Sequence, residues 1–135
     1  LWFGAIDDVW IHNKTKKLII ADYKATSKKT EVSLDADWQI AYKRQMEFYQ
    51  WLMRSNGFEV EDEGWFVYCN GKVFDNHFNG QLSFDIKMIP YQGDDAWIEP
   101  TLDNIKTCLD SEITPSANAN CKYCKYINNI NLASK

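Results

Sequence analysis

The chain has 135 residues, of which 45% are hydrophobic and 15% aromatic, a composition that excludes an intrinsically disordered protein and supports one domain with a substantial core. No run of about 18 apolar residues occurs, which argues against a membrane-spanning helix. The formal net charge of −4 hides an asymmetry, because residues 1–57 carry nine Lys or Arg against seven Asp or Glu, whereas residues 58–135 carry six against twelve.

Two runs rich in β-branched and aromatic residues open the chain and predict neighbouring β-strands. The first run covers residues 1–11 and the second covers residues 18–24. The polar residues 13–16 between them suit a hairpin loop. The pairs that such a loop predicts are Ile11 with Leu18, Val9 with Ile20, Asp7 with Asp22, and Ala5 with Lys24.

This register places two carboxylates side by side above an apolar floor formed by the first two pairs. Directly opposed residues share a face of the sheet, so Asp7 and Asp22 would lie roughly 5 Å apart at Cβ. Two carboxylates so close repel each other unless a cation lies between them, and Mg²⁺ is commonly held by one or two carboxylates. Lys24 follows Asp22 by two residues and is expected on the same face, beside that cation.

The choice between Asp7 and Asp8 depends on the length of the loop. A loop one residue longer or shorter would bring Asp8 to this face in place of Asp7. We prefer Asp7, because its face continues into Val9 and Ile11.

A helix is expected over residues 36–56, with Asp35 as its N-cap and Gly57 as its C′ residue. Gln45 and Tyr49 lie one turn apart along its apolar stripe. A core tyrosine and a glutamine that caps a strand would also account for these two residues. The stripe itself is formed by Trp38, Ala41, Phe48 and Leu52.

The remaining elements are expected in this order: a strand over 65–69, a type I′ hairpin turn at Asn70-Gly71, a strand over 82–89, and a helix from Asp94 or Asp95 to about Leu109. Pro100 is tolerable in that helix only in or near the first turn. The polar tail after Pro115 is expected to depend on its cysteine pair for structure.

Four cysteines at positions 69, 108, 121 and 124 do not form the pattern of a secreted disulfide scaffold, and they favour a reduced, cytoplasmic protein. Cys69 lies in an apolar run and is expected in the core. An iron–sulfur cluster needs four ligands, and so does a structural zinc ion. We therefore expect neither in this chain, with Cys121 and Cys124 either free thiols or half of a cluster completed elsewhere.

Three motifs in order, Gly4-x-x-Asp7, Asp22-Tyr23-Lys24 and Gln45-x-x-x-Tyr49, resemble those of the PD-(D/E)XK nuclease superfamily in its RecB-like exonuclease branch. The resemblance implies a restriction-endonuclease-like α/β fold, a mixed β-sheet flanked by α-helices, in a single domain over residues 1–135. It implies Mg²⁺ or Mn²⁺ held by Asp7, Asp22 and the main-chain carbonyl of Tyr23. Lys24 would orient the attacking water or offset phosphate charge, with Gln45 and Tyr49 beside it.

The chain departs from that branch in two places. Relatives usually carry a helix with a motif histidine before the first strand, and this sequence lacks it, so we expect a fragment of a longer protein. Some relatives bind an iron–sulfur cluster through an early cysteine and a late Cys-x₂-Cys-x₅-Cys group. Here Cys121 and Cys124 supply the pair, but Ile130 stands at the last position.

The resemblance implies a metal-dependent deoxyribonuclease of exonuclease type, in DNA repair, recombination or phage DNA processing. Its partners would be single- or double-stranded DNA and a helicase or another recombination protein, with no membrane. The cations expected to meet phosphates near the site are Lys14, Lys16, Lys17, Lys28, Lys29, Lys43 and Arg44. The alternative is a non-catalytic nucleic-acid-binding or assembly domain of the same fold, which the intact Asp7, Asp22 and Lys24 disfavour.

Overall fold

The structure, a computed structural model, describes residues 1–72 and 80–133. The chain divides into two compact units, residues 1–98 and residues 99–135. The single domain over residues 1–135 stays a prediction, and each unit is treated by itself below. The elements, in chain order, are β1 (Asp8–Ile11), β2 (Leu18–Thr26), the 3₁₀ turn η1 (Asp37–Gln39), α1 (Ile40–Ser55), β3 (Glu63–Gly71), β4 (Phe84–Gln92), α2 (Ile98–Asp110) and α3 (Lys122–Ala133).

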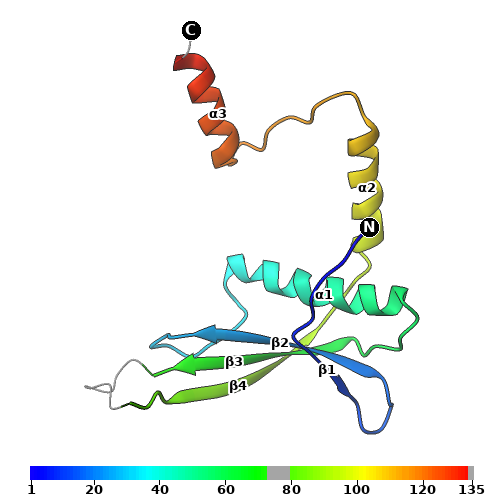
Figure 1. Ribbon diagram of the computed structural model, residues 1–135, viewed down its shortest axis with the longest axis vertical. Coiled ribbons are helices and arrows are strands. Elements are labelled where there is room, and N and C mark those ends of the chain that lie inside the picture. The colour runs from blue at the N-terminus through cyan, green and yellow to red at the C-terminus, as the bar shows by residue number, and fades with distance from the viewer. Residues whose placement is uncertain (73–79, 134–135) are drawn as a thin grey trace. The chain divides into compact units, whose positions relative to one another are not determined.

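The first unit is a four-stranded mixed sheet with one long helix on it. The strand order is β1-β2-β3-β4, with β2 and β3 parallel and both outer pairs antiparallel. Parallel neighbours need a crossover connection, and α1 supplies it, running across one face of the sheet (Figure 1). The expected fold class, an α/β fold with a mixed sheet and flanking helix, is confirmed.

The first hairpin has the predicted register, since Val9 pairs with Ile20 and Ile11 with Leu18. Its loop is closed by a hydrogen bond from the His12 N–H to the Lys17 carbonyl, at 2.9 Å. The ladder begins only at Asp8, so residues 1–7 are not the strand expected there, and the pairs predicted beyond Asp8 lie outside the sheet.

The apolar floor predicted beneath the carboxylates is only half present. Ile20 is fully buried, and Leu18 packs against the core. In contrast, Val9 is 37% and Ile11 63% exposed, because β1 is a short strand at the edge of the sheet. The floor therefore consists of β2 residues rather than of both strands.

The helix predicted over 36–56 is present, but its predicted apolar stripe is only partly buried, since Phe48 and Tyr49 pack in or against the core whereas Trp38 is exposed. A 3₁₀ turn precedes α1, and the N-cap residues are Ala36 and Gln39 rather than Asp35. Gly57 is the C′ residue as predicted, with φ +87°. The predicted stripe begins at Trp38, which is 56% exposed. The residues of α1 that are buried are Met46, Glu47, Tyr49 and Gln50.

Polar side chains are buried on α1 and η1 because they satisfy main-chain groups of the loops. Gln50 Nε2 donates to the carbonyls of Glu61 and Asp62, and Gln39 Nε2 donates to the carbonyl of Ser33. Hydropathy counts glutamine as a surface residue, so the apolar stripe did not indicate these buried positions.

The turn predicted at Asn70-Gly71 is wrong, because β3 continues through Gly71 and pairs it with Phe84. Asn70 is held in the strand by two hydrogen bonds between its side-chain amide and the main chain of Lys28. Residues 73–79, between β3 and β4, lie outside the described residues. The strand predicted over 82–89 is present as β4.

Helix α2 begins at Ile98, the last residue of the first unit, which is four and three residues after the expected Asp94 and Asp95, and it has Pro100 in its first turn. The tail contains α3, a helix that the sequence analysis did not predict. Within the described residues, no helix is long and apolar enough to cross a membrane.

Candidate active site

The centre of the candidate site is an ion pair on β2 beneath α1. Asp22 is 2% exposed, and Lys24 lies two residues further along the same face. The Lys24 Nζ atom is 2.5 Å from Asp22 Oδ2. Burial next to the core holds this pair in a region where charges are poorly screened.

Asp7 joins β2 from the segment that precedes β1. Its Oδ2 atom accepts a hydrogen bond of 2.8 Å from the main-chain N–H of Tyr23. A carboxylate thus takes the N–H that a longer β1 would have paired, which explains why the ladder stops at Asp8. The segment is anchored on α1, since the Trp2 ring packs against Phe48 with centroids 6.4 Å apart.

Asp8, the alternative to Asp7, belongs to the other face. Its side chain accepts hydrogen bonds from Trp10 Nε1 and from the Tyr23 hydroxyl, each at 2.9 Å. These bonds, with one from the Val9 N–H, hold the pKa of Asp8 below its ordinary value. Its acceptors are engaged away from Asp22, so Asp7 is the acid that accompanies Asp22.

Gln45 and Tyr49 extend the site onto α1. Lys24 Nζ donates to Gln45 Oε1 at 3.2 Å, and Gln45 Nε2 donates to the Tyr49 hydroxyl at 3.0 Å. The Lys24 ammonium also lies over the Tyr42 ring, 4.4 Å from its centroid. A continuous chain of contacts therefore links Asp22, Lys24, Gln45 and Tyr49. The Lys24 ammonium is oriented by the ion pair with Asp22, the hydrogen bond to Gln45 and the Tyr42 ring.

Gly4 makes room for Tyr49. A Cβ atom added at Gly4 would lie 2.6 Å from Tyr49 Cε1, closer than side chains tolerate. The glycine of the first motif therefore lets the segment that carries Asp7 pass against the tyrosine of the third motif. Gly4 of the first motif and Tyr49 of the third therefore pack against each other.

The Asp22 carboxyl lies in an environment that is compatible with a bound cation. Burial raises its pKa above the ordinary value, the Lys24 ammonium opposes this rise, and the negative charge of Asp7 adds to it. Among the described residues, no hydrogen bond of regular geometry reaches the buried Oδ2 atom, although Lys24 is close. A second carboxylate nearby and a buried oxygen without a regular donor are what a hard divalent cation would satisfy.

The residues that could hold such a cation are Asp7, Asp22 and the main-chain carbonyl of Tyr23. Within the described residues, no group of three or more His, Cys, Asp or Glu side chains could hold a metal ion. A cation at this site would thus have few protein ligands and would complete its shell with water and substrate phosphate. That is the usual manner of Mg²⁺, and the residues present fit it.

The predicted nucleic-acid-binding cations are dispersed. Lys28, in the loop after β2, lies over the Trp38 ring, 5.5 Å from its centroid, and Lys29 beside it is exposed. Lys43 lies over the Tyr91 ring and Arg44 over the Trp97 ring, at 5.8 and 5.7 Å. A role of these four residues in binding nucleic acid stays a prediction.

Contrary to the prediction, Lys14, Lys16 and Lys17 are not near the site. They lie in the β1–β2 loop, at the end of β2 that is opposite to Lys24. Lys17 precedes Lys24 by seven residues of extended chain, about 23 Å at 3.3 Å per residue.

The sequence analysis missed Tyr42 and Glu47. Tyr42 is three residues before Gln45 and seven before Tyr49, a helical spacing that could have revealed it. Glu47 is 7% exposed and accepts hydrogen bonds from the Tyr91 hydroxyl at 2.5 Å and Trp97 Nε1 at 2.7 Å. Its partners come from residues about fifty positions later, so no local pattern signals it.

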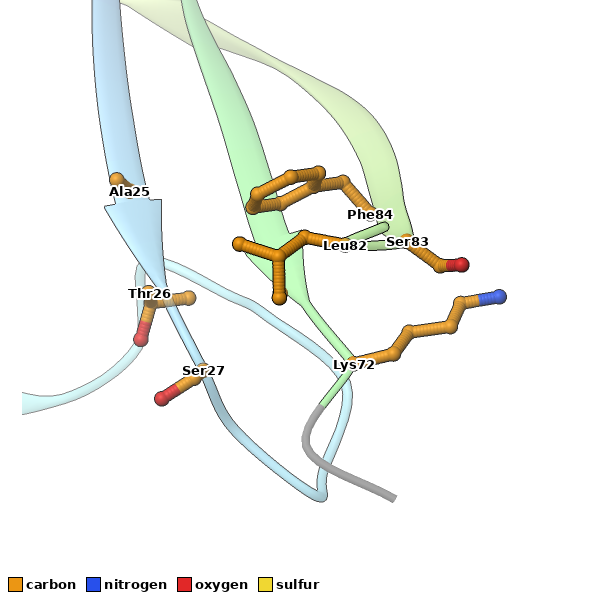
Figure 2. A pocket seen from close by; sticks show the side chains of 8 residues that line it. Ala25, Thr26, Ser27, Lys72, Leu82, Ser83 and Phe84 are labelled. Carbon is orange, nitrogen blue, oxygen red and sulfur yellow. The ribbon is translucent and has the colours of Figure 1, made fainter. Parts of the chain in front are cut away.

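Figure 2 shows a separate pocket of about 410 Å³ near the ends of β2 and β3, into which Leu82 and Phe84 project. Its described lining residues include a lysine, two serines and a threonine but no Asp, Glu, His or Cys. It therefore offers no ligand set comparable to that of Asp7 and Asp22.

In the second unit, Cys121 and Cys124 meet at the start of α3. The Cys124 N–H donates to Cys121 Sγ at 3.3 Å. Contact with the Cys124 thiol and this N–H lower the pKa of Cys121, and the same thiol contact raises the pKa of Cys124. The absence of an iron–sulfur cluster and of zinc stays a prediction.

Comparison with known proteins gives one positive finding. A family model described as the PD-(D/E)XK nuclease superfamily matches residues 3–128, nearly the whole chain. The match begins just before Gly4 and includes all three motifs. No curated protein and no solved structure matches significantly.

Proposed function

We propose that this chain, which belongs to the PD-(D/E)XK nuclease superfamily, is a metal-dependent deoxyribonuclease that hydrolyses phosphodiester bonds. The observation that carries the proposal is the contact chain from Asp22 through Lys24 to Gln45, with Asp7 beside it on the Tyr23 N–H. A structural ion pair would need neither the second carboxylate nor the relay of side chains from α1.

Each residue of the site has a separate task in this proposal. Asp7, Asp22 and the Tyr23 carbonyl would hold Mg²⁺ or Mn²⁺. Such a cation, when bound, lowers the pKa of a coordinated water and neutralises developing charge. Lys24 holds the water or the phosphate oxygen through its ammonium. Gln45 restrains that ammonium, and Tyr49 restrains Gln45 by accepting a hydrogen bond from its amide nitrogen.

The finer assignment is a RecB-like exonuclease that acts in DNA repair, recombination or phage DNA processing, on single- or double-stranded DNA. Its support is the order of the three motifs, above all Gln45 and Tyr49 on the helix after the second acid. A helicase or another recombination protein as a partner, and a cytoplasmic location, belong to the same proposal.

The test separates metal binding from chemistry. Titration calorimetry with Mn²⁺ should show binding in the wild type and its loss in Asp22→Asn. Lys24→Gln should keep most of the Mn²⁺ affinity but lower the single-turnover cleavage rate of labelled DNA at least about 100-fold, equivalent to about 2.7 kcal/mol. Asp8→Asn, a change of the neighbouring acid on the other face, is the matched control.

Equal Mn²⁺ binding by the wild type and Asp22→Asn would refute the metal site. Cleavage by Lys24→Gln at the wild-type rate would refute the role of Lys24. Should the wild type bind both Mn²⁺ and DNA without cutting DNA, the non-catalytic nucleic-acid-binding domain would replace the nuclease.

A further inference from the structure

Trp38 is an exposed aromatic ring held in a fixed position. It lies in η1, directly before α1, and 56% of its surface is exposed. The Tyr42 ring meets it edge-on, with centroids 5.3 Å apart and planes at 82°. The Lys28 ammonium lies 5.5 Å from its centroid. An indole is usually buried for most of its area, so a ring that is restrained by neighbours yet open to solvent is unusual.

The same contacts connect Trp38 to the candidate active site. Tyr42 contacts both the Trp38 ring and the Lys24 ammonium, which lies 4.4 Å from the Tyr42 ring centroid. Two short contacts in succession place the indole within about 10 Å of Lys24. Nucleotides of a stacked strand repeat at about 3.4 Å, so about three of them span that distance.

An exposed indole beside a lysine is suited to an unpaired nucleobase. Aromatic side chains bind single-stranded nucleic acids by stacking on successive bases, while nearby cations hold the backbone. In a duplex the faces of each base are already covered by its neighbours. A base that stacks on Trp38 must therefore be free of pairing and of at least one stacking neighbour.

We propose that Trp38 is a stacking platform for an unpaired base of the substrate strand, with Lys28, whose ammonium lies over the ring, available for the phosphate backbone. The preferred substrate would then carry a single-stranded stretch within a few nucleotides of the scissile phosphate. This inference rests on the proposed function only in that the bound strand is the one cut at Asp22 and Lys24.

Phe58 provides a matched control. It is 51% exposed, similar to Trp38, but it follows the C-terminal end of α1 and lies at the opposite end of that helix from Trp38. Phe58→Ala removes a comparable exposed ring without touching Tyr42 or Lys24. Trp38→Phe keeps an aromatic face in place, and Trp38→Ala removes it.

The experiment measures fluorescence anisotropy of a labelled single-stranded oligonucleotide and of a labelled blunt hairpin duplex, in EDTA so that cleavage does not interfere. Trp38→Ala should weaken single-strand binding about 5- to 100-fold, the effect of losing one stacked base. Its duplex affinity should stay within about twofold of the wild type. Trp38→Phe should retain most of the single-strand affinity, and Phe58→Ala all of it.

Three results would overturn the inference: wild-type single-strand binding by Trp38→Ala, an equal loss for strand and duplex, or no single-strand binding by the wild-type protein. Cleavage with Mn²⁺, measured in parallel, keeps the two proposals apart. A loss of binding in Trp38→Ala without any Asp22-dependent cleavage would leave the platform standing and refute the nuclease. Asp22-dependent cleavage with unaltered binding in Trp38→Ala would do the reverse.

Discussion

Gly4→Ala should disable the candidate site from a residue that contacts no metal and no phosphate. The new Cβ would lie 2.6 Å from Tyr49 Cε1, whereas carbon atoms in contact are usually about 3.5 to 4.0 Å apart. The chain must therefore yield by about 1 Å. Tyr49 is 8% exposed and packed in the core, so the exposed segment that carries Asp7 should move instead.

Because Asp7 follows Gly4 by three residues, its carboxylate would move away from Asp22. Changes that misplace a ligand in this way weaken metal affinity or activity about 10- to 100-fold. Titration calorimetry with Mn²⁺ measures the effect directly. The free energy of unfolding should change by less than about 1 kcal/mol, because Gly4 is exposed and its segment is not part of the sheet.

A second substitution identifies the clash as the cause. Tyr49→Leu, added to Gly4→Ala, removes the ring and should restore part of the Mn²⁺ affinity, whereas Tyr49→Phe keeps the ring and should restore none. Gly71→Ala is the control, since its Cβ would meet Phe84 at an ordinary 3.4 Å, far along β3. Wild-type Mn²⁺ affinity in Gly4→Ala, or an equal loss in Gly71→Ala, would contradict the reasoning.

Two further predictions concern groups outside the metal site. Glu47→Ala leaves the Tyr91 hydroxyl and Trp97 Nε1 without their acceptor and should lower the free energy of unfolding by about 2 to 4 kcal/mol, measured by urea titration. Glu47→Gln should have an intermediate effect. An unchanged urea midpoint in Glu47→Ala would show that these hydrogen bonds do not contribute to stability. Because the pKa of Cys121 is lowered and that of Cys124 raised, iodoacetamide should alkylate Cys121 first as the pH rises towards 9, and Cys124→Ala should move the Cys121 profile to higher pH. Preferential labelling of Cys124 would show that the contact at α3 is absent.

The part of the site on the hairpin could be predicted because a short loop fixes the register of two strands. Once residues 13–16 form the loop, Val9 must face Ile20, and Asp7 and Asp22 fall on one side. This argument uses only neighbouring residues, and the structure agrees with the register it gives.

On α1, the third motif indicated Gln45 and Tyr49, but the buried polar residues of the helix could not be predicted from local patterns. The helix buries Glu47 and Gln50, whose partners come from distant loops and from β4, whereas the apolar Trp38 in the preceding η1 turn is largely exposed. Periodicity indicates which face of a helix is apolar. Here Glu47 and Gln50 are buried because they form hydrogen bonds with distant segments, and sequence patterns do not predict where those segments lie.

Two polar side chains of α1, the buried Gln50 and the partly buried Arg54, contact the loop before β3 through its main chain. Gln50 and Arg54 donate to the carbonyls of residues 60–62, which every amino acid possesses. These four hydrogen bonds do not depend on the side chains of the loop residues, whereas they do depend on the donors of the helix; Asp62 adds a side-chain contact, an ion pair with Arg54. We expect natural variants and designed libraries to tolerate replacement at Glu61, to keep an apolar residue at Val60, which is 5% exposed and part of the core, and to select strongly for glutamine and arginine at the two helix positions.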